Sequence, residues 1–132
     1  MLPEISWLGV LAIAAGAVPG ALSRYYLTEF CKRVRGTNFP YGTFVINLTG
    51  CFLMGFSFTL FREIKGFPQE VDLLVRTGFL GSYTTFSTYG YDTLMLWRNN
   101  QPGTTLFYWM GSAILGLLGL GVGCALAQLL VG

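Results

Sequence analysis

Long stretches without a charged residue constrain the fold of this chain more than any other feature of its sequence. Its 132 residues include only 8 Lys+Arg and 6 Asp+Glu, and these cluster so that residues 5–23, 36–61, 77–91 and 99–132 carry no charge. As a helix, the first stretch would cover about 28.5 Å, close to the roughly 30 Å hydrocarbon core of a bilayer. The sequence therefore predicts an all-α, polytopic membrane protein.

The composition agrees with a membrane location and excludes several classes of function. Hydrophobic residues make up 53% of the chain and charged residues 11%, about half the charged fraction usual in soluble domains. With a net charge of +2, no histidine and few basic clusters, the chain offers no surface suited to nucleic acid. The three cysteines are odd in number and unevenly spaced, so we interpret them as packing residues.

The pattern predicts four helices joined by short polar connections, within one transmembrane domain that spans residues 1–132. The expected helices cover residues 7–26, 41–61, 73–97 and 104–131.

Basic residues are nearly balanced between the two ends of these helices. Five would lie on one side of the membrane and three on the other, so the positive-inside rule gives only a weak orientation. Two alternatives stay open: insertion in both orientations, or one orientation set by the charges of the first loop. The five are Arg24, Lys32, Arg33, Arg35 and Arg98, and the three are Arg62, Lys65 and Arg76.

The third stretch, residues 77–91, is too short and too polar for an ordinary lipid-facing helix. Glycines, hydroxylated residues and aromatics follow one another through its middle. Such a composition weakens a helix and supplies groups that satisfy freed backbone, which is typical of a helix broken inside a protein-lined cavity. The alternative is a short interfacial loop.

Small and polar residues recur at helical spacing on the other three helices. The first helix carries Gly9, Gly16 and Gly20 on one face, which predicts close packing against a neighbour. The fourth carries Gly116, Gly119 and Gly123, and the same face continues backward through Ser112 and Tyr108. The second carries a polar ladder of Thr43, Asn47 and Gly50.

Asn47 is the polar residue that most needs a partner, because an unpaired amide in an apolar setting costs about 2–7 kcal/mol. Asn47 would therefore either clamp a neighbouring helix or contact a polar species that passes. A lone Ser or Thr, in contrast, usually bonds the carbonyl four residues earlier in its own helix.

The middles of the first, second and fourth expected helices contain no Asp, Glu, His or Lys. A proton-coupled antiporter needs such a titrating group. Neutral hydrogen-bond donors and the positive edges of aromatic rings instead favour a small, hard anion that moves without proton coupling.

Three motifs carry a resemblance to a known family, and they follow in order along nearly the whole chain. Together they resemble the Fluc (CrcB) family of fluoride ion channels. The motifs are Gly16-x-x-x-Gly20-Ala21-x-x-Arg24-Tyr25, Gly42-Thr43-x-x-x-Asn47-x-x-Gly50 and Gly78-x-x-Gly81-x-x-Thr84-Thr85-Phe86-Ser87-Thr88.

The resemblance implies an antiparallel, dual-topology homodimer in the bacterial inner membrane, with two fluoride pathways. It also implies a structural sodium ion on the two-fold axis, bound by the backbone carbonyls of Gly81 and Thr84 where the third helices break. By the same resemblance, Asn47 would donate to fluoride, Phe86 would present an aromatic edge to it, and Arg24 would lie at the aqueous entrance.

Tyr89 departs from the family pattern, which has a second phenylalanine at that position. Its added hydroxyl would bond either fluoride or a neighbouring helix. The resemblance completes the predicted pathway with Thr43, Ser87, Tyr108 and Ser112, although Gly116 stands where a further hydroxyl is often expected.

The leading hypothesis is a channel, not an enzyme, that passively exports cytoplasmic fluoride. The alternative is a small dual-topology drug/cation exporter, and a third class is a non-transporting accessory subunit. An exporter needs a membrane-embedded glutamate, whereas the chain's four glutamates all lie at helix ends or in loops: Glu4, Glu29, Glu63 and Glu70.

Overall fold

The computed structural model describes Glu4 and residues 6–132, and all regular secondary structure in these residues is helical. Within these residues, three helices are long and apolar enough to cross a membrane: α1 (Trp7–Arg35), α2 (Tyr41–Glu63) and α6 (Pro102–Val131). The predicted all-helical membrane class is thus confirmed. Residues 1–3 and 5 of the predicted domain lie outside the described residues.

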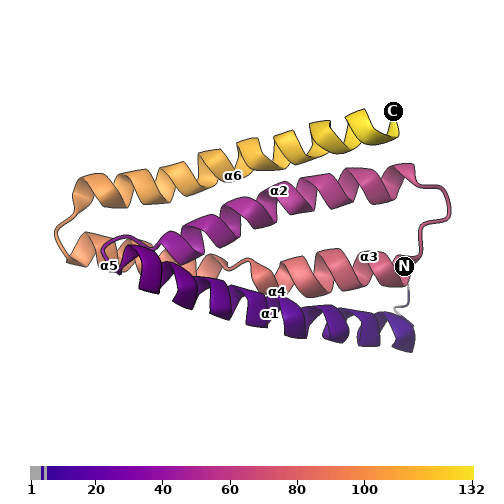
Figure 1. Cartoon of the computed structure of the whole chain (residues 1–132), viewed down its shortest axis with the longest axis horizontal. Coiled ribbons are helices and arrows are strands. Elements are labelled where there is room, and N and C mark those ends of the chain that lie inside the picture. Colours follow the sequence, from indigo (N-terminus) through magenta and orange to yellow (C-terminus); the bar gives the residue numbers. More distant parts are fainter. Residues whose placement is uncertain (1–3, 5) are drawn as a thin grey trace.

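The chain between α2 and α6 forms a broken helical run instead of one continuous helix (Figure 1). The run comprises α3 (Gln69–Asp72), the π-helical η1 (Leu73–Leu80), α4 (Gly81–Tyr83) and α5 (Phe86–Arg98). Between α4 and α5, Thr84 and Thr85 have extended backbone, with ψ angles of 158° and 119°. Because helix stands on both sides of these two residues, the predicted break is confirmed.

Two predicted helix boundaries were wrong: the end of the first helix and the start of the fourth. The first helix was expected to stop at residue 26, yet α1 continues to Arg35, and Gly36 ends it with a φ of 78°. Its last turns carry basic side chains, which stabilise the negative end of the helix dipole. The fourth helix begins two residues early because Pro102 is well tolerated in a first turn.

The elements pack in two pairs, α2 beside α6 and α1 beside the broken run (Figure 1). In the first pair, backbones touch at glycines: a Cβ atom at Gly123 would lie 2.2 Å from the Phe52 carbonyl oxygen, and one at Gly55 would lie 2.1 Å from that of Leu120. The predicted glycine face of the fourth helix is therefore a packing face.

The second pair is equally close. A Cβ atom at Gly16 would lie 2.0 Å from the Leu74 carbonyl oxygen, and one at Gly20 would lie 2.3 Å from that of Phe79. The glycine face predicted for the first helix thus contacts η1. This contact holds one side of the broken run in place.

The apolar core is small and lies where α2 meets the broken run. Its buried members are Ile46, Leu80 and Tyr83. Most other large apolar side chains are exposed in the single chain, as expected when lipid or a second chain covers the outer surface.

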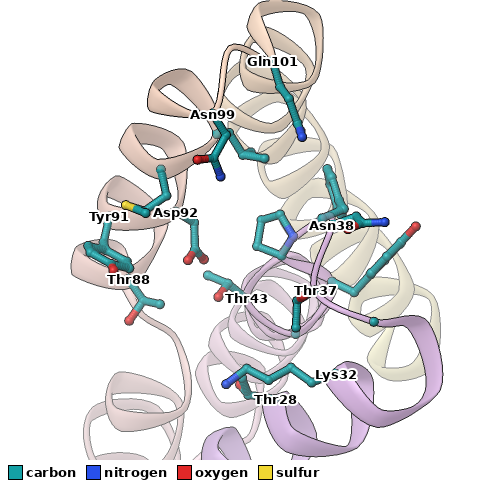
Figure 2. Close-up of a pocket in the computed structure, with 17 residues that line it drawn as sticks. Thr28, Lys32, Thr37, Asn38, Thr43, Thr88, Tyr91, Asp92, Asn99 and Gln101 are labelled. Carbon is teal, nitrogen blue, oxygen red and sulfur yellow. The ribbon is translucent and has the colours of Figure 1, made fainter.

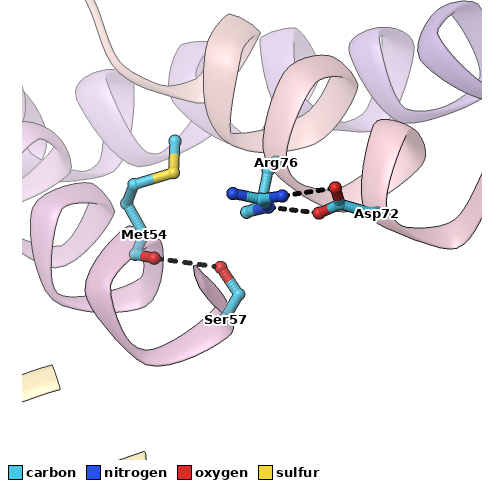
Figure 3. A network of polar contacts seen from close by, with 4 residues as sticks. All are labelled: Met54, Ser57, Asp72 and Arg76. Carbon is cyan, nitrogen blue, oxygen red and sulfur yellow. Dashed lines mark hydrogen bonds and ion pairs between the residues drawn. The ribbon is translucent and has the colours of Figure 1, made fainter. Parts of the chain in front are cut away.

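An ion pair joins two of the charged residues at the start of the broken run, Asp72 and Arg76. Arg76 donates from Nε and Nη2 to the two carboxylate oxygens of Asp72, one helical turn earlier (Figure 3). The guanidinium carbon of Arg76 also stands 5.3 Å from the centre of the Phe58 ring on α2. Pairing and stacking make it feasible to place these charges beside an apolar helix.

Candidate functional site

The backbone of the break is held by a side chain from α2. The Asn47 amide donates from Nδ2 to the Thr85 carbonyl at 3.0 Å and accepts at Oδ1 from the Thr85 N–H at 2.9 Å. Of the two roles predicted for Asn47, the structure shows the hydrogen-bonded contact with a neighbouring helical segment. An amide nitrogen carries two N–H groups, so one Nδ2 donor is left for a further acceptor.

These bonds free two backbone carbonyls at the break. In a continuous helix, the Thr85 N–H would bond the Gly81 carbonyl and the Thr88 N–H would bond the Thr84 carbonyl. Instead, Thr85 donates to Asn47, and Thr88 donates to the Thr85 hydroxyl at 3.3 Å, which caps α5. The Gly81 and Thr84 carbonyls therefore both lose their helical donors.

Freed carbonyls are neutral oxygen ligands of the kind that bind hard monovalent cations at broken membrane helices. Among the described residues, no group of three or more His, Cys, Asp or Glu side chains is placed to hold a metal ion. The donor set at Gly81 and Thr84 thus fits sodium, and it offers nothing that a transition metal prefers.

A cavity of about 580 Å³ opens at the end of the molecule where α1 ends and α2 and α6 begin. Polar side chains from several elements line it, and Figure 2 shows Thr43 of α2 and Asp92 of α5 pointing toward one another across it. The cavity is wide enough to admit water. Its other polar lining residues include Thr28, Lys32, Asn38, Thr88, Asn99 and Gln101.

Two tyrosines lie beside the cavity-lining Asp92: Tyr108 of α6, which bonds it, and Tyr89 of α5, which packs against Tyr108. Tyr108 is completely buried, and its hydroxyl donates to Asp92 Oδ2 at 3.2 Å. The Tyr89 ring lies 5.5 Å from the Tyr108 ring, and the Tyr89 hydroxyl donates to the Trp109 carbonyl at 2.6 Å. Of the two partners open to the Tyr89 hydroxyl, the structure shows the neighbouring helix.

Ser112 differs from most hydroxyls on these helices. Thr49, Thr84 and Thr105 each donate to the carbonyl four residues earlier, as lone hydroxyls usually do. The Ser112 hydroxyl is buried and has no hydrogen-bond partner among the described residues. Leaving a buried hydroxyl without a partner costs about 1–3 kcal/mol of folding free energy. The Ser112 hydroxyl is therefore a donor that an added acceptor would satisfy.

The other predicted site residues do not line the cavity. Phe86 is 84% exposed and Ser87 is also exposed, although the Phe86 ring stands 5.7 Å from that of Tyr89. Gly81 is exposed and Thr84 half-buried at the break. Arg24 is half-buried on α1 and is not among the residues that line the cavity.

Asp92 is the site residue that the sequence reasoning missed. It lies within the expected third helix, and an ionisable residue inside a membrane helix is a candidate functional residue by default. The absence of Asp, Glu, His and Lys holds only for the middles of the other three expected helices. The structure places the Asp92 carboxylate in the cavity, bonded to a predicted pathway residue.

The chain is similar to several known proteins along most of its length. The chain is 48% identical over 118 residues to a Synechococcus sp. (strain JA-2-3B'a(2-13)) protein named Fluoride-specific ion channel FluC, covering 89% of this chain and 91% of that protein. Proteins of the same name from Trichormus variabilis and Synechocystis sp. are 46% and 45% identical, covering 90% and 89% of this chain and 88% and 91% of theirs.

A family model covers most of the chain as well. The model described as CrcB-like protein, Camphor Resistance (CrcB), matches residues 11–124. This range includes all three sequence motifs, the break and the cavity-lining residues. The chain therefore belongs to the CrcB family.

Proposed function

We propose that the chain is a subunit of a fluoride-selective channel that lets cytoplasmic fluoride leave the cell passively. Its relatives are named as fluoride-specific ion channels, and its long apolar helices fit a multi-pass protein of the bacterial inner membrane. It is a transport protein and not an enzyme.

The observation that carries the proposal is the buried hydroxyl of Ser112, which has no partner in the described part of the chain and lies on the face of α6 that also carries Tyr108. Fluoride is a small anion that must exchange its hydration shell for hydrogen-bond donors in a narrow pathway. The Ser112 hydroxyl, the free N–H of Asn47 and the Thr43 hydroxyl are such donors. Being uncharged, they would bind fluoride weakly enough to release it.

The working channel would be an antiparallel homodimer with two pathways. In this arrangement the broken run provides a fourth membrane pass, so each chain crosses four times. A second copy in the opposite orientation would cover Phe86, Ser87 and Gly81, which are exposed in the single chain. The Phe86 edge would then line a pathway together with residues of the partner.

Sodium would be a structural ion of this dimer. Two facing breaks would bring together the freed carbonyls of Gly81 and Thr84 from both chains. When bound, the ion would supply positive charge that holds the two breaks together. The carbonyls would position the ion, and the fluoride route would run elsewhere, along α2 and α6.

Reconstitution into liposomes tests the proposal. Liposomes loaded with fluoride and containing the purified protein should release fluoride rapidly and chloride far more slowly. A Ser112→Ala channel should release fluoride several-fold more slowly, whereas Ala125→Ser, on an exposed position of α6, should behave as the wild type.

Other outcomes would identify the alternatives. Release of an organic cation driven by a proton gradient would favour the exporter. No solute movement through correctly assembled dimers would favour the accessory subunit.

A further inference from the structure

A side-chain hydrogen bond ties the carbonyl-bearing turn of the broken run to α2. Tyr83 is 8% exposed, and its hydroxyl lies 2.9 Å from the Thr49 hydroxyl. Thr49 lies 2.7 Å from the Val45 carbonyl of its own helix, which takes the single Thr49 proton. Tyr83 is therefore the donor and Thr49 the acceptor, and the pair has one defined orientation.

Tyr83 stands between the two residues whose carbonyls are free. It ends α4, a helix of only three residues from Gly81 to Tyr83, and Thr84 follows at once in extended conformation. On its N-terminal side α4 continues η1, and the Thr84 N–H still bonds the Leu80 carbonyl at 3.1 Å, but the helix stops at Tyr83. The carbonyls of a last helical turn have no donors within their own helix. The orientation of the Gly81 and Thr84 carbonyls thus depends on what their neighbours contact.

Three contacts anchor this part of the chain, and each acts at a different residue. Asn47 clamps the backbone of Thr85, after the free carbonyls. Ser82 donates toward the Ala17 carbonyl of α1 at 2.9 Å, although its hydroxyl also lies 2.8 Å from the Gly78 carbonyl of its own run. The Tyr83 hydroxyl is therefore the side-chain link to α2 that lies between the two free carbonyls.

We infer that Tyr83 and Thr49 are positioning residues of the cation site. Their bond fixes the turn so that the Gly81 and Thr84 carbonyls are oriented before the ion arrives, which lowers the ordering cost of binding. The sodium concentration needed to activate the channel is then set in part by two hydroxyls that do not touch the ion. This inference rests on the proposed sodium site.

The bond also links the cation site to the helix that lines the anion route. Thr49 lies on α2 with Thr43 and Asn47, and a Cβ atom at the adjacent Gly50 would lie 2.2 Å from Thr84 Cγ2. One stretch of α2 therefore supports the break and presents donors to fluoride. Tyr83 and Thr49 therefore affect the binding of sodium and not the donors that face fluoride.

The test measures fluoride efflux from liposomes after sodium has been removed and then restored in steps. Tyr83→Phe and Thr49→Val each remove the bond while keeping the shape of the side chain. Interhelical hydrogen bonds in membranes have modest strengths, so the half-activating sodium concentration should rise about threefold to tenfold. Maximal fluoride flux at saturating sodium should stay within about twofold of the wild type.

Matched variants separate positioning from general damage. Thr49→Ser keeps the acceptor hydroxyl and should restore the wild-type sodium dependence, and the double variant Tyr83→Phe/Thr49→Val should shift it no further than either single change. Tyr26→Phe removes a hydroxyl from an exposed tyrosine of α1 and should leave the curve unchanged.

A second readout keeps this inference separate from the proposed function. The rise in melting temperature of the purified dimer on adding sodium requires no transport, and both variants should need more sodium to reach it. Unchanged sodium dependence in both variants, by flux and by melting, would overturn the positioning role. Sodium-dependent melting without any fluoride flux would instead refute the channel and leave the positioning role standing.

Discussion

At the scale of single residues, Asn47 shows how one side chain can hold the break and still keep a donor free. Its carboxamide satisfies the N–H and the carbonyl of Thr85 and still holds one N–H in reserve. A donor or an acceptor alone would leave one of these backbone groups unpaired. The amide is thus the side chain that both closes the break and presents a neutral donor.

Substitution of Asn47 should slow transport. Asn47→Ala leaves the Thr85 N–H and carbonyl without partners, at a cost of about 1–3 kcal/mol, and removes the spare donor. Asn47→Asp keeps an acceptor for the N–H but places a negative charge that repels fluoride. We expect fluoride efflux to fall about tenfold or more in both, measured with a fluoride electrode.

The matched control for this prediction is Gln128→Ala, which removes an exposed amide from α6 and should not alter flux. If Asn47→Ala dimers assembled correctly and transported at the wild-type rate, Asn47 would have no place in the pathway.

Phe86 is the second residue whose role can be isolated. Phe86→Ile keeps bulk but removes the ring edge, and aromatic edges are worth about 0.5–1.5 kcal/mol in favourable contacts. We therefore expect flux to fall up to about tenfold while the dimer fraction on gel filtration stays unchanged. Phe30→Ile, at another exposed phenylalanine on α1, serves as the control. Normal transport by Phe86→Ile would refute the aromatic-edge account.

At the scale of elements, glycine contacts decide how closely the helices pair. Gly123 and Gly121 are two residues apart on α6, yet a Cβ atom would collide with the Phe52 carbonyl at the first and meets nothing within 4 Å at the second. The two positions therefore provide a matched pair for testing the α2–α6 contact.

Gly123→Ala should destabilise the fold by about 1–3 kcal/mol, because a rigid backbone atom must move to admit the methyl group. Gly121→Ala should be neutral or slightly stabilising, because alanine favours a helix over glycine. The measurement is the melting temperature of the purified protein in detergent. Equal melting temperatures for the two variants would show that α2 and α6 are less tightly packed than described.

At the scale of the whole molecule, the balance of basic charges bears on how chains insert. Because five basic residues face three, we expect wild-type chains to occur in both orientations in one membrane. Protease protection of terminal tags in inverted and right-side-out vesicles reports this directly. Wild-type chains with both termini always on one side would contradict the prediction.

Added charge should shift this balance. Two Lys residues introduced within residues 66–69 should hold that loop on the cytoplasmic side, skew insertion and reduce the number of functional dimers. Two Gln residues at the same positions add no charge, so they should leave the insertion of the chain and the fluoride flux unchanged.

The sequence by itself determined the class of the fold. Its uncharged, apolar stretches are long enough to cross a membrane, and in lipid a helix satisfies all of the backbone hydrogen bonds of such a stretch. It also determined the glycine faces at Gly16, Gly20 and Gly123, since helical spacing alone puts small residues in register. The break was visible as well, in a stretch where glycines and hydroxyls replace apolar residues. These are local features, and local composition encodes them.

Only the tertiary structure decided how the side chains are used. Spacing left Asn47 two roles and Tyr89 two partners, and the choice depended on which backbone groups the neighbouring elements brought within reach. Asp92 enters the site because α5 turns it toward Tyr108. The Gly81 carbonyl is free because Asn47 of α2 takes its helical donor, the Thr85 N–H. Hydrogen bonds between residues far apart in the chain depend on packing, which periodicity along one helix does not specify.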